Sequence, residues 1–273
     1  MSRLKRLKTS LTQFPDIKAP PLWLLATEQR AFWEYFAGLA LYKPLKRAAP
    51  RGDGHPVLVI PGLGASDVST ALLRRFLDDL GYTTYPWGMG RNRGVKEEVS
   101  TTMEQLLQDI YARHGQQKVS IVGQSLGGVF ARELAKLAPH QVRQVITLGS
   151  PFTGHPLASS VARFYEWISG DKLDNINFDR HVEMRVKPPV PTTAVYSKLD
   201  GVVAWRCSIE EGTPEGESIH LRGNTHCGMA VSPSALYLVA ERLAQAPDQW
   251  KAFEPQGLGR VFYGAQDHLP AHG

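Results

Sequence analysis

The chain lacks the features that define several large classes of protein. Two cysteines in 273 residues, Cys207 and Cys227, are too few for a disulfide-built scaffold, and their neighbours supply no second pair of metal ligands. No run of about 18 apolar residues is present that could span a bilayer. The sequence also has no Walker A motif, no G-x-G-x-x-G fingerprint, no zinc-finger spacing and no RNA-binding signature. We therefore expect no nucleic-acid partner, despite a formal net charge of +5.

Part of the positive charge lies at the N-terminus, where like charges are typical of a solvated tail. The basic residues are Arg3, Lys5, Arg6 and Lys8. They are not followed by an uninterrupted apolar segment and a small-residue cleavage site, so the pattern of a secretory signal is missing. We expect a cytoplasmic protein that keeps its two cysteines as thiols.

Residues 21–42 predict an amphipathic helix, continuous or broken, in which polar residues interrupt an aromatic and aliphatic run. The large apolar side chains of interest are Trp23, Phe32, Trp33 and Phe36. The simpler interpretation is that they pack on the main domain. The alternative is a peripheral membrane-surface, lipid-surface or partner-binding face.

Strand-like and helix-like segments alternate along most of the chain. Short β-branched runs that end in a turn predict strands, and longer segments with apolar residues three and four apart predict helices. The expected strands are 55–64, 82–87, 118–124, 142–150, 192–200 and 217–224, and the expected helices are 66–82, 94–115, 126–140 and 232–245. This alternation is typical of an α/β protein with a mostly parallel central sheet and helices on both faces.

The same pattern gives the domain organisation. We expect an N-terminal extension at 1–54, one α/β domain at 55–245 and a C-terminal tail at 246–273. The alternation lapses in an insertion at about 151–191. At the first helix of the domain, Ser66 or Asp67 is expected to act as the N-cap.

The segment "KVSIVGQSLGGVF" contains a G-x-S-x-G pentad centred on Ser125. The pentad alone carries a false-positive risk, but here a predicted strand precedes it and a predicted helix follows. A serine on so sharp a turn needs neighbours without a Cβ, and Gly123 and Gly127 meet that need. A phosphate-cradling or merely close-packed glycine turn is the alternative.

A serine nucleophile requires a base and an acid that orients it. His226 lies in a loop between a predicted strand and the last helix, and Asp200 ends the strand-like run "TTAVYSKLD". Both would emerge at the same edge of the sheet as Ser125. The amide of Leu126, just after the nucleophile, and that of Leu63 in "IPGLGAS" are the expected oxyanion donors.

With these residues in this order, the sequence resembles the α/β-hydrolase superfamily, most closely its bacterial serine esterase and lipase branch. The resemblance rests on "PGLG", "GQSLGG", "YSKLDGVV" and "THCGM", and covers residues 55 to about 245. Pro61 stands where many relatives carry His, and the N-terminal extension has no counterpart in a minimal member.

The resemblance implies that the 151–191 insertion is a cap or lid that lines the acyl pocket. The candidates for contact with an acyl chain are Phe152, Phe164, Tyr165 and Trp167, although ordinary packing explains them as well. Some secreted relatives have a disulfide at the histidine loop; thiols remain our expectation here.

These residues lead to one main hypothesis, a serine hydrolase that cleaves carboxylic esters through a Ser-His-Asp triad and an acyl-enzyme, without a metal or organic cofactor. The partner would be an acyl ester or a lipid-like small molecule. An acyltransferase, thioesterase or polyester depolymerase would use the same triad, because the choice lies in pocket shape and water access. A non-catalytic binding protein on this fold is the alternative from another class.

Overall fold

The structure, a computed structural model, describes residues 17–94, 97–153, 184–210, 214–257 and 259–264. A seven-stranded sheet with the order β2-β1-β3-β4-β5-β6-β7 runs through it. The strands are β1 Pro56–Ile60, β2 Thr83–Pro86, β3 Val119–Gln124, β4 Val142–Leu148, β5 Thr192–Tyr196, β6 Gly216–Leu221 and β7 Tyr263–Gly264. All neighbouring pairs are parallel except β6 and β7, which are antiparallel.

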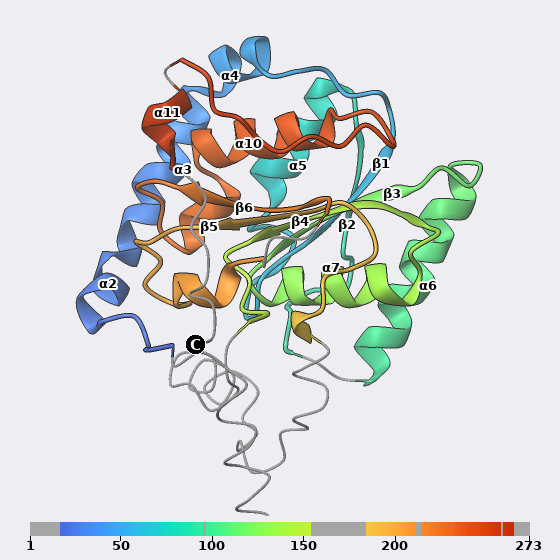
Figure 1. Cartoon of the computed structure of the whole chain (residues 1–273), viewed down its shortest axis with the longest axis horizontal. Coiled ribbons are helices and arrows are strands. Elements are labelled where there is room, and N and C mark those ends of the chain that lie inside the picture. The colour runs from blue at the N-terminus through green and yellow to red at the C-terminus, as the bar shows by residue number, and fades with distance from the viewer. Residues whose placement is uncertain (1–16, 95–96, 154–183, 211–213, 258, 265–273) are drawn as a thin grey trace, which may run out of the picture.

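Helices cover both faces of the sheet (Figure 1). In chain order they are α2 Leu22–Ala26, η1 Thr27–Arg30, α3 Ala31–Ala40, α4 Tyr42–Ala48, α5 Ala71–Leu80, α6 Glu97–Arg113, α7 Leu126–Leu137, η3 Trp205–Ser208, η4 Cys227–Ala230, α10 Pro233–Leu243 and α11 Gly259–Phe262. The predicted α/β architecture is confirmed. No helix among the described residues combines the length and hydrophobicity needed to cross a bilayer.

Strand β1 shows how the sequence builds two cores. Val57 and Val59 point to the side that α5 and α10 cover, whereas Leu58 and Ile60 point to the side of α6 and α7. Successive side chains of a strand point to opposite faces, so a continuous apolar run is required where both faces are covered.

The predicted cap of the first domain helix is wrong. Helix α5 begins at Ala71, its N-cap position is Thr70, and no side chain caps it. The Asp67 carboxylate instead accepts hydrogen bonds from the Trp87 and Gly88 amides at 3.0 and 3.2 Å. A polar side chain close to a helix start can serve a neighbouring loop as readily as the helix, and here it fixes the exit of β2.

The C-terminal segment differs from the tail expected at 246–273. Residues 263–264 form β7 and extend the sheet by an edge strand, with Leu221 opposite Tyr263. The Tyr263 hydroxyl donates to the Ser234 carbonyl at 2.9 Å, which ties this strand to α10. A two-residue strand leaves too short a pattern for sequence reasoning to detect.

The helix predicted at residues 21–42 is broken, because the 3-10 turn η1 separates α2 from α3. The prediction that its large apolar side chains pack on the domain is wrong. Trp23, Phe32 and Trp33 are 61%, 64% and 73% exposed, and Phe36 is 46% exposed. Apart from Leu24, the side of this element that packs on the domain carries small and acidic residues.

Candidate active site

Ser125 lies at the turn between β3 and α7, in a conformation that non-glycine residues rarely adopt. Its φ is 52° and its ψ is −125°. The Ser125 amide donates to the Leu148 carbonyl of the neighbouring strand β4 at 2.8 Å, which fixes the turn. Its side chain is buried, and its Oγ has no hydrogen-bond partner among the described residues. A strained backbone that holds an unpartnered hydroxyl is typical of a functional position.

The two glycines of the pentad are required by close backbone contacts. A Cβ on Gly123 would lie 2.3 Å from the Gly127 carbonyl oxygen, and a Cβ on Gly127 would lie 2.4 Å from the Ile60 carbonyl oxygen. Both atoms belong to backbone that cannot rotate away. The geometry therefore agrees with the sequence-based prediction that these positions must lack a Cβ.

Asp200 and His226 are in direct contact. Asp200 Oδ2 lies 2.6 Å from His226 Nδ1, and both side chains are buried. The other carboxylate oxygen, Oδ1, accepts hydrogen bonds from the Val202 and Val203 amides at 2.8 and 2.7 Å. With the carboxylate fixed in this way, a proton on Nδ1 donates to Asp200, and Nε2 is the acceptor nitrogen of the neutral imidazole.

The electrostatics favour a charged imidazole at His226. Burial alone would lower its pKa, but the charge and the hydrogen bond of Asp200 raise it above the ordinary histidine value, and the Glu28 carboxylate adds to this. The imidazolium that forms when His226 accepts a proton is therefore stabilised by its surroundings.

Several contacts bring this pair to the same edge of the sheet as Ser125. A Cβ on Gly149, the residue after β4, would lie 3.1 Å from both Asp200 Oδ2 and His226 Nδ1. The side chain of Gln124 donates to the His226 carbonyl at 3.3 Å. The three predicted residues thus come from the carboxyl ends of β3, β5 and β6, where ligands of parallel sheets bind.

The loop after β1 is held by Asn92, a residue that sequence reasoning missed. Asn92 is fully buried, and its side-chain amide donates to the Pro61 carbonyl at 3.0 Å. Its backbone carbonyl accepts from the Gly64 amide at 2.7 Å, and its backbone amide donates to the Ala65 carbonyl at 2.8 Å. These bonds fix the residues on either side of Leu63, whose amide is the predicted oxyanion donor, and that assignment stays a prediction.

Leu126, the other predicted oxyanion donor, is the first residue of α7. The first amides of a helix have no partner within the helix, and they lie at the positive end of its dipole. This position is suited to stabilising negative charge that develops next to Ser125, and the role stays a prediction.

Glu28, on η1, joins the loops that carry Asp200 and His226. Its Oε1 accepts from the Gly201 and His226 amides, each at 2.9 Å, and its Oε2 accepts from the Cys227 amide at 3.1 Å. Sequence reasoning missed this residue because its partners are 173 to 199 residues away along the chain.

Glu34, on α3, contacts the same loop as Glu28, just before His226. It accepts from the Thr225 amide at 3.0 Å and from the Asn224 side chain at 3.3 Å. Burial raises its pKa, although the hydrogen bonds from Thr225 oppose this. One signal was available in the sequence, since Glu28 and Glu34 interrupt an otherwise largely apolar run.

A second Ser-His-Asp arrangement lies at the opposite edge of the sheet. Asp53 contacts His55 Nδ1, and His55 Nε2 lies 2.8 Å from Ser120 Oγ. His55 and Ser120 both have an exposed fraction of 0% and sit at the amino ends of β1 and β3. Ser120 Oγ is already hydrogen-bonded, and this end of the sheet is opposite to the carboxyl ends of the strands, where ligands of parallel sheets bind, so the group links strands and is no candidate for catalysis.

A family model described as the alpha/beta hydrolase fold matches residues 55–182. The match begins at the first strand of the sheet and includes the Ser125 turn. The chain belongs to the α/β-hydrolase superfamily.

Several solved structures are similar to the chain at low sequence identity. Lipase B of Aspergillus fumigatus aligns with a TM-score of 0.57 and 18% identity, over 75% of this chain and 57% of that lipase, so the chain spans little more than half of it. An alpha/beta superfamily hydrolase from Oenococcus oeni PSU-1 aligns with a TM-score of 0.48 and 18% identity, over 69% and 91%. A Paleococcus ferrophilus monoacylglycerol lipase gives 0.47 and 16%, over 65% and 88%. At 18% identity, the likeness to the Aspergillus fumigatus lipase is one of fold.

Of the expected acyl-contact residues in this α/β hydrolase, Phe164, Tyr165 and Trp167 lie outside the described residues. Phe152 is buried, and the Arg132 guanidinium lies 3.8 Å from its ring centroid. Packing against Arg132 accounts for the burial of Phe152, and contact with an acyl chain stays a prediction.

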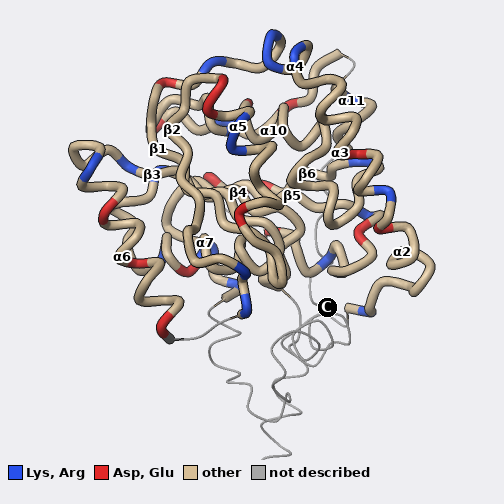
Figure 2. Tube along the Cα trace, turned by 180° about the vertical axis from the view of Figure 1, so that it is seen from behind, with Lys and Arg blue, Asp and Glu red and all other residues tan. Residues whose placement is uncertain are grey.

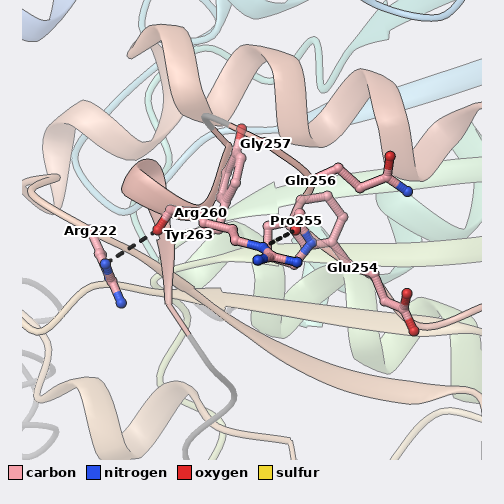
Figure 3. A pocket seen from close by; sticks show the side chains of 8 residues that line it. Arg222, Glu254, Pro255, Gln256, Gly257, Arg260 and Tyr263 are labelled. Atoms are coloured by element: carbon pink, nitrogen blue, oxygen red, sulfur yellow. Dashed lines mark hydrogen bonds between the residues drawn. The ribbon is translucent and has the colours of Figure 1, made fainter.

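A pocket of about 770 Å³ lies among the C-terminal residues of this α/β hydrolase (Figure 3). Its lining consists of Arg222, Phe253, Glu254, Pro255, Gln256, Gly257, Arg260 and Tyr263. Arg222 donates to the Arg260 carbonyl and Arg260 to the Pro255 carbonyl, each at 3.3 Å. None of the predicted site residues lines this pocket, so it is separate from the candidate active site.

The two cysteines are thiols, Cys207 buried and Cys227 exposed.

Proposed function

We propose that this α/β hydrolase cleaves carboxylic esters, with Ser125 as its nucleophile. The observation that carries the proposal is the state of Ser125: a strained turn presents its buried, unpartnered hydroxyl at the sheet edge where Asp200 and His226 are hydrogen-bonded. A hydroxyl needs a base in order to attack a carbonyl carbon, and a histidine oriented by a carboxylate provides one.

The chemistry follows the roles of the three side chains. His226 Nε2 accepts the Ser125 proton as Oγ attacks the ester carbonyl, and Asp200 stabilises the resulting imidazolium. The amides of Leu63 and Leu126 are the donors assigned to the tetrahedral oxyanion. His226 then protonates the leaving alcohol, and a water molecule repeats the cycle on the acyl-enzyme.

Replacement of one hydroxyl tests this proposal. Ser125→Ala is expected to lower kcat for a p-nitrophenyl ester by about a million-fold, because the nucleophile itself is removed. The rate of ester hydrolysis is measured with the purified variant, after its unfolding midpoint has been found equal to that of the unaltered chain.

Ser120→Ala is the matched control, because it removes the serine hydroxyl of the buried array at the other sheet edge. Its kcat should remain near that of the unaltered chain. Hydrolysis that survives in Ser125→Ala, or that is lost equally in both variants, would refute the assignment.

A further inference from the structure

The extension formed by α2, η1 and α3 is amphipathic in the reverse of the usual sense. Its inward positions follow a spacing of three and four residues and hold Leu24, Glu28, Ala31, Glu34 and Gly38, all buried or half-buried. A Cβ on Gly38 would lie 2.2 Å from the Val231 carbonyl oxygen, which shows how closely α3 approaches the domain. A helix on a globular core normally turns its large apolar residues inward.

The large apolar residues of this element face solvent instead. Nine of the fourteen exposed large hydrophobic side chains of the described residues lie between residues 22 and 41. They are Leu22, Trp23, Leu25, Phe32, Trp33, Tyr35, Phe36, Leu39 and Leu41, which we call the apolar face. On α3 the rings of Phe32, Trp33, Tyr35 and Phe36 contact one another in series, and a cluster of this kind marks an interaction surface rather than scattered exposure.

The charges around the apolar face suit an anionic lipid surface. The two acidic residues of the element, Glu28 and Glu34, are turned inward onto backbone amides, so they place no negative charge on the face. Exposed cations stand at its two ends, Lys18 before α2 and Lys43 and Arg47 on α4 (Figure 2). Trp, Tyr and Phe together with Lys and Arg are the residues that bind at a membrane interface.

We propose that the apolar face docks this protein on a lipid surface that carries anionic headgroups. The position of the apolar face relates this contact to the candidate active site, because the opposite side of the same element binds the loops of Asp200 and His226. Docking there would bring a lipid surface next to the candidate active site.

Vesicle flotation tests this inference without relying on hydrolysis. The full-length chain with Ser125→Ala is mixed with vesicles of phosphatidylcholine alone or of phosphatidylcholine and phosphatidylglycerol. We expect binding to the anionic vesicles that weakens with salt, and a loss of about a hundredfold in affinity when Phe32→Ser and Trp33→Ser are added. Both side chains are exposed, so the unfolding midpoint should not change.

Val261→Ser with Phe262→Ser is the matched control, because these α11 residues are also exposed, at 62% and 52%. That variant should bind like the parent. Absence of binding to both vesicles, or equal binding by all variants, would overturn the inference. The inference would also be overturned if the protein is a dimer that dissociates when Phe32→Ser and Trp33→Ser are introduced. That result would assign the apolar face to contact with a second copy of the chain.

A second inference rests on different contacts and on the proposed function. We call the loop that carries Asp200 the acid loop and the loop that carries His226 the base loop. Glu28 Oε1 accepts one hydrogen bond from a backbone amide of each loop, and Oε2 accepts a third from the amide of the residue after His226. The geometry points to Glu28 as a positioning residue that holds Asp200 and His226 in register. A glutamine has one acceptor oxygen, and its NH₂ group would face an amide that also donates.

Among the described residues, the charged and titratable groups in contact with the His226 loop include Asp200, Glu28 and Glu34, and the Cys227 thiol belongs to the loop itself. Of these, Asp200 and Glu28 raise the pKa of His226. Activity requires the neutral imidazole, so it rises with pH through this pKa. Removing the Glu28 charge lowers the pKa and moves the acidic limb of the kcat/KM profile to lower pH.

Glu28→Gln should therefore lower kcat about tenfold with little change in KM, and shift the acidic limb downward. Glu34→Gln is the control, since it removes a neighbouring carboxylate that contacts Thr225 and Asn224 but not the acid loop. Loss of stability alone in Glu28→Gln, with kcat and the acidic limb unchanged, would overturn the role. Ser125→Ala assayed in parallel reports separately on the proposed function.

Discussion

At Gly127 the backbone of α7 approaches the end of β1 so closely that no side chain fits. A Cβ there would lie 2.4 Å from the Ile60 carbonyl oxygen and 2.7 Å from that of Pro61. Those carbonyls precede the loop assigned to oxyanion stabilisation. The same contact therefore contributes to the fold and sets the distance between Leu63 and the nucleophile turn.

Gly127→Ala should destabilise the protein by about 2 to 3 kcal/mol, because overpacking forces backbone to shift. It should also lower kcat, since the shift displaces the loop after β1. Denaturant unfolding and ester hydrolysis measure the two effects.

Gly115→Ala is the control for Gly127→Ala. Gly115 has a φ of 62°, and a Cβ added there would have open space around it out to 4 Å. The change therefore costs about 1 kcal/mol in backbone strain and leaves kcat unchanged. Equal kcat in both variants would contradict the account of Gly127.

At the scale of elements, Arg132 connects α7 to both ends of the 151–191 insertion. Its guanidinium lies over the Phe152 ring at the start and donates to the Arg185 and Val186 carbonyls at 3.3 and 3.2 Å at the end. It also forms a fully buried ion pair with Glu210. The helix that begins at the nucleophile thus fixes the points where the insertion leaves and rejoins the domain.

Arg132→Met should cost about 3 to 5 kcal/mol of unfolding free energy, because it leaves the Glu210 carboxylate buried without a partner. Adding Glu210→Leu should recover most of this loss, since the uncompensated charge is then gone. Equilibrium denaturation of the single and double variants gives the comparison. A single variant that loses less than about 1 kcal/mol would show that the pair is of little importance for stability.

At the scale of the whole molecule, the sequence predicts well what depends on local pattern. The alternating apolar runs predict the sheet, and the placement of Ser125, Asp200 and His226 at one sheet edge can be predicted because each follows a strand. A residue at the end of a parallel strand needs only that strand to be placed at the correct sheet edge.

Contacts between segments that are distant in the sequence could not be predicted from local patterns. Glu28 and Asn92 act on loops to which no local pattern connects them. The burial of small and acidic residues in the extension reverses the usual amphipathic rule, so the rule placed Trp33 inside when it is 73% exposed. Asp53, His55 and Ser120 show the opposite risk, because they reproduce a catalytic combination at the amino ends of the strands, away from the sheet edge where ligands bind.

Covalent labelling would identify the nucleophile of this α/β hydrolase, which we propose is Ser125. The intact chain is treated with an activated fluorophosphonate, and the modified peptide is identified by mass spectrometry. We expect a single adduct on Ser125 that is absent from Ser125→Ala and retained in Ser120→Ala. An unmodified Ser125 in folded protein, or an adduct on another serine, would contradict it.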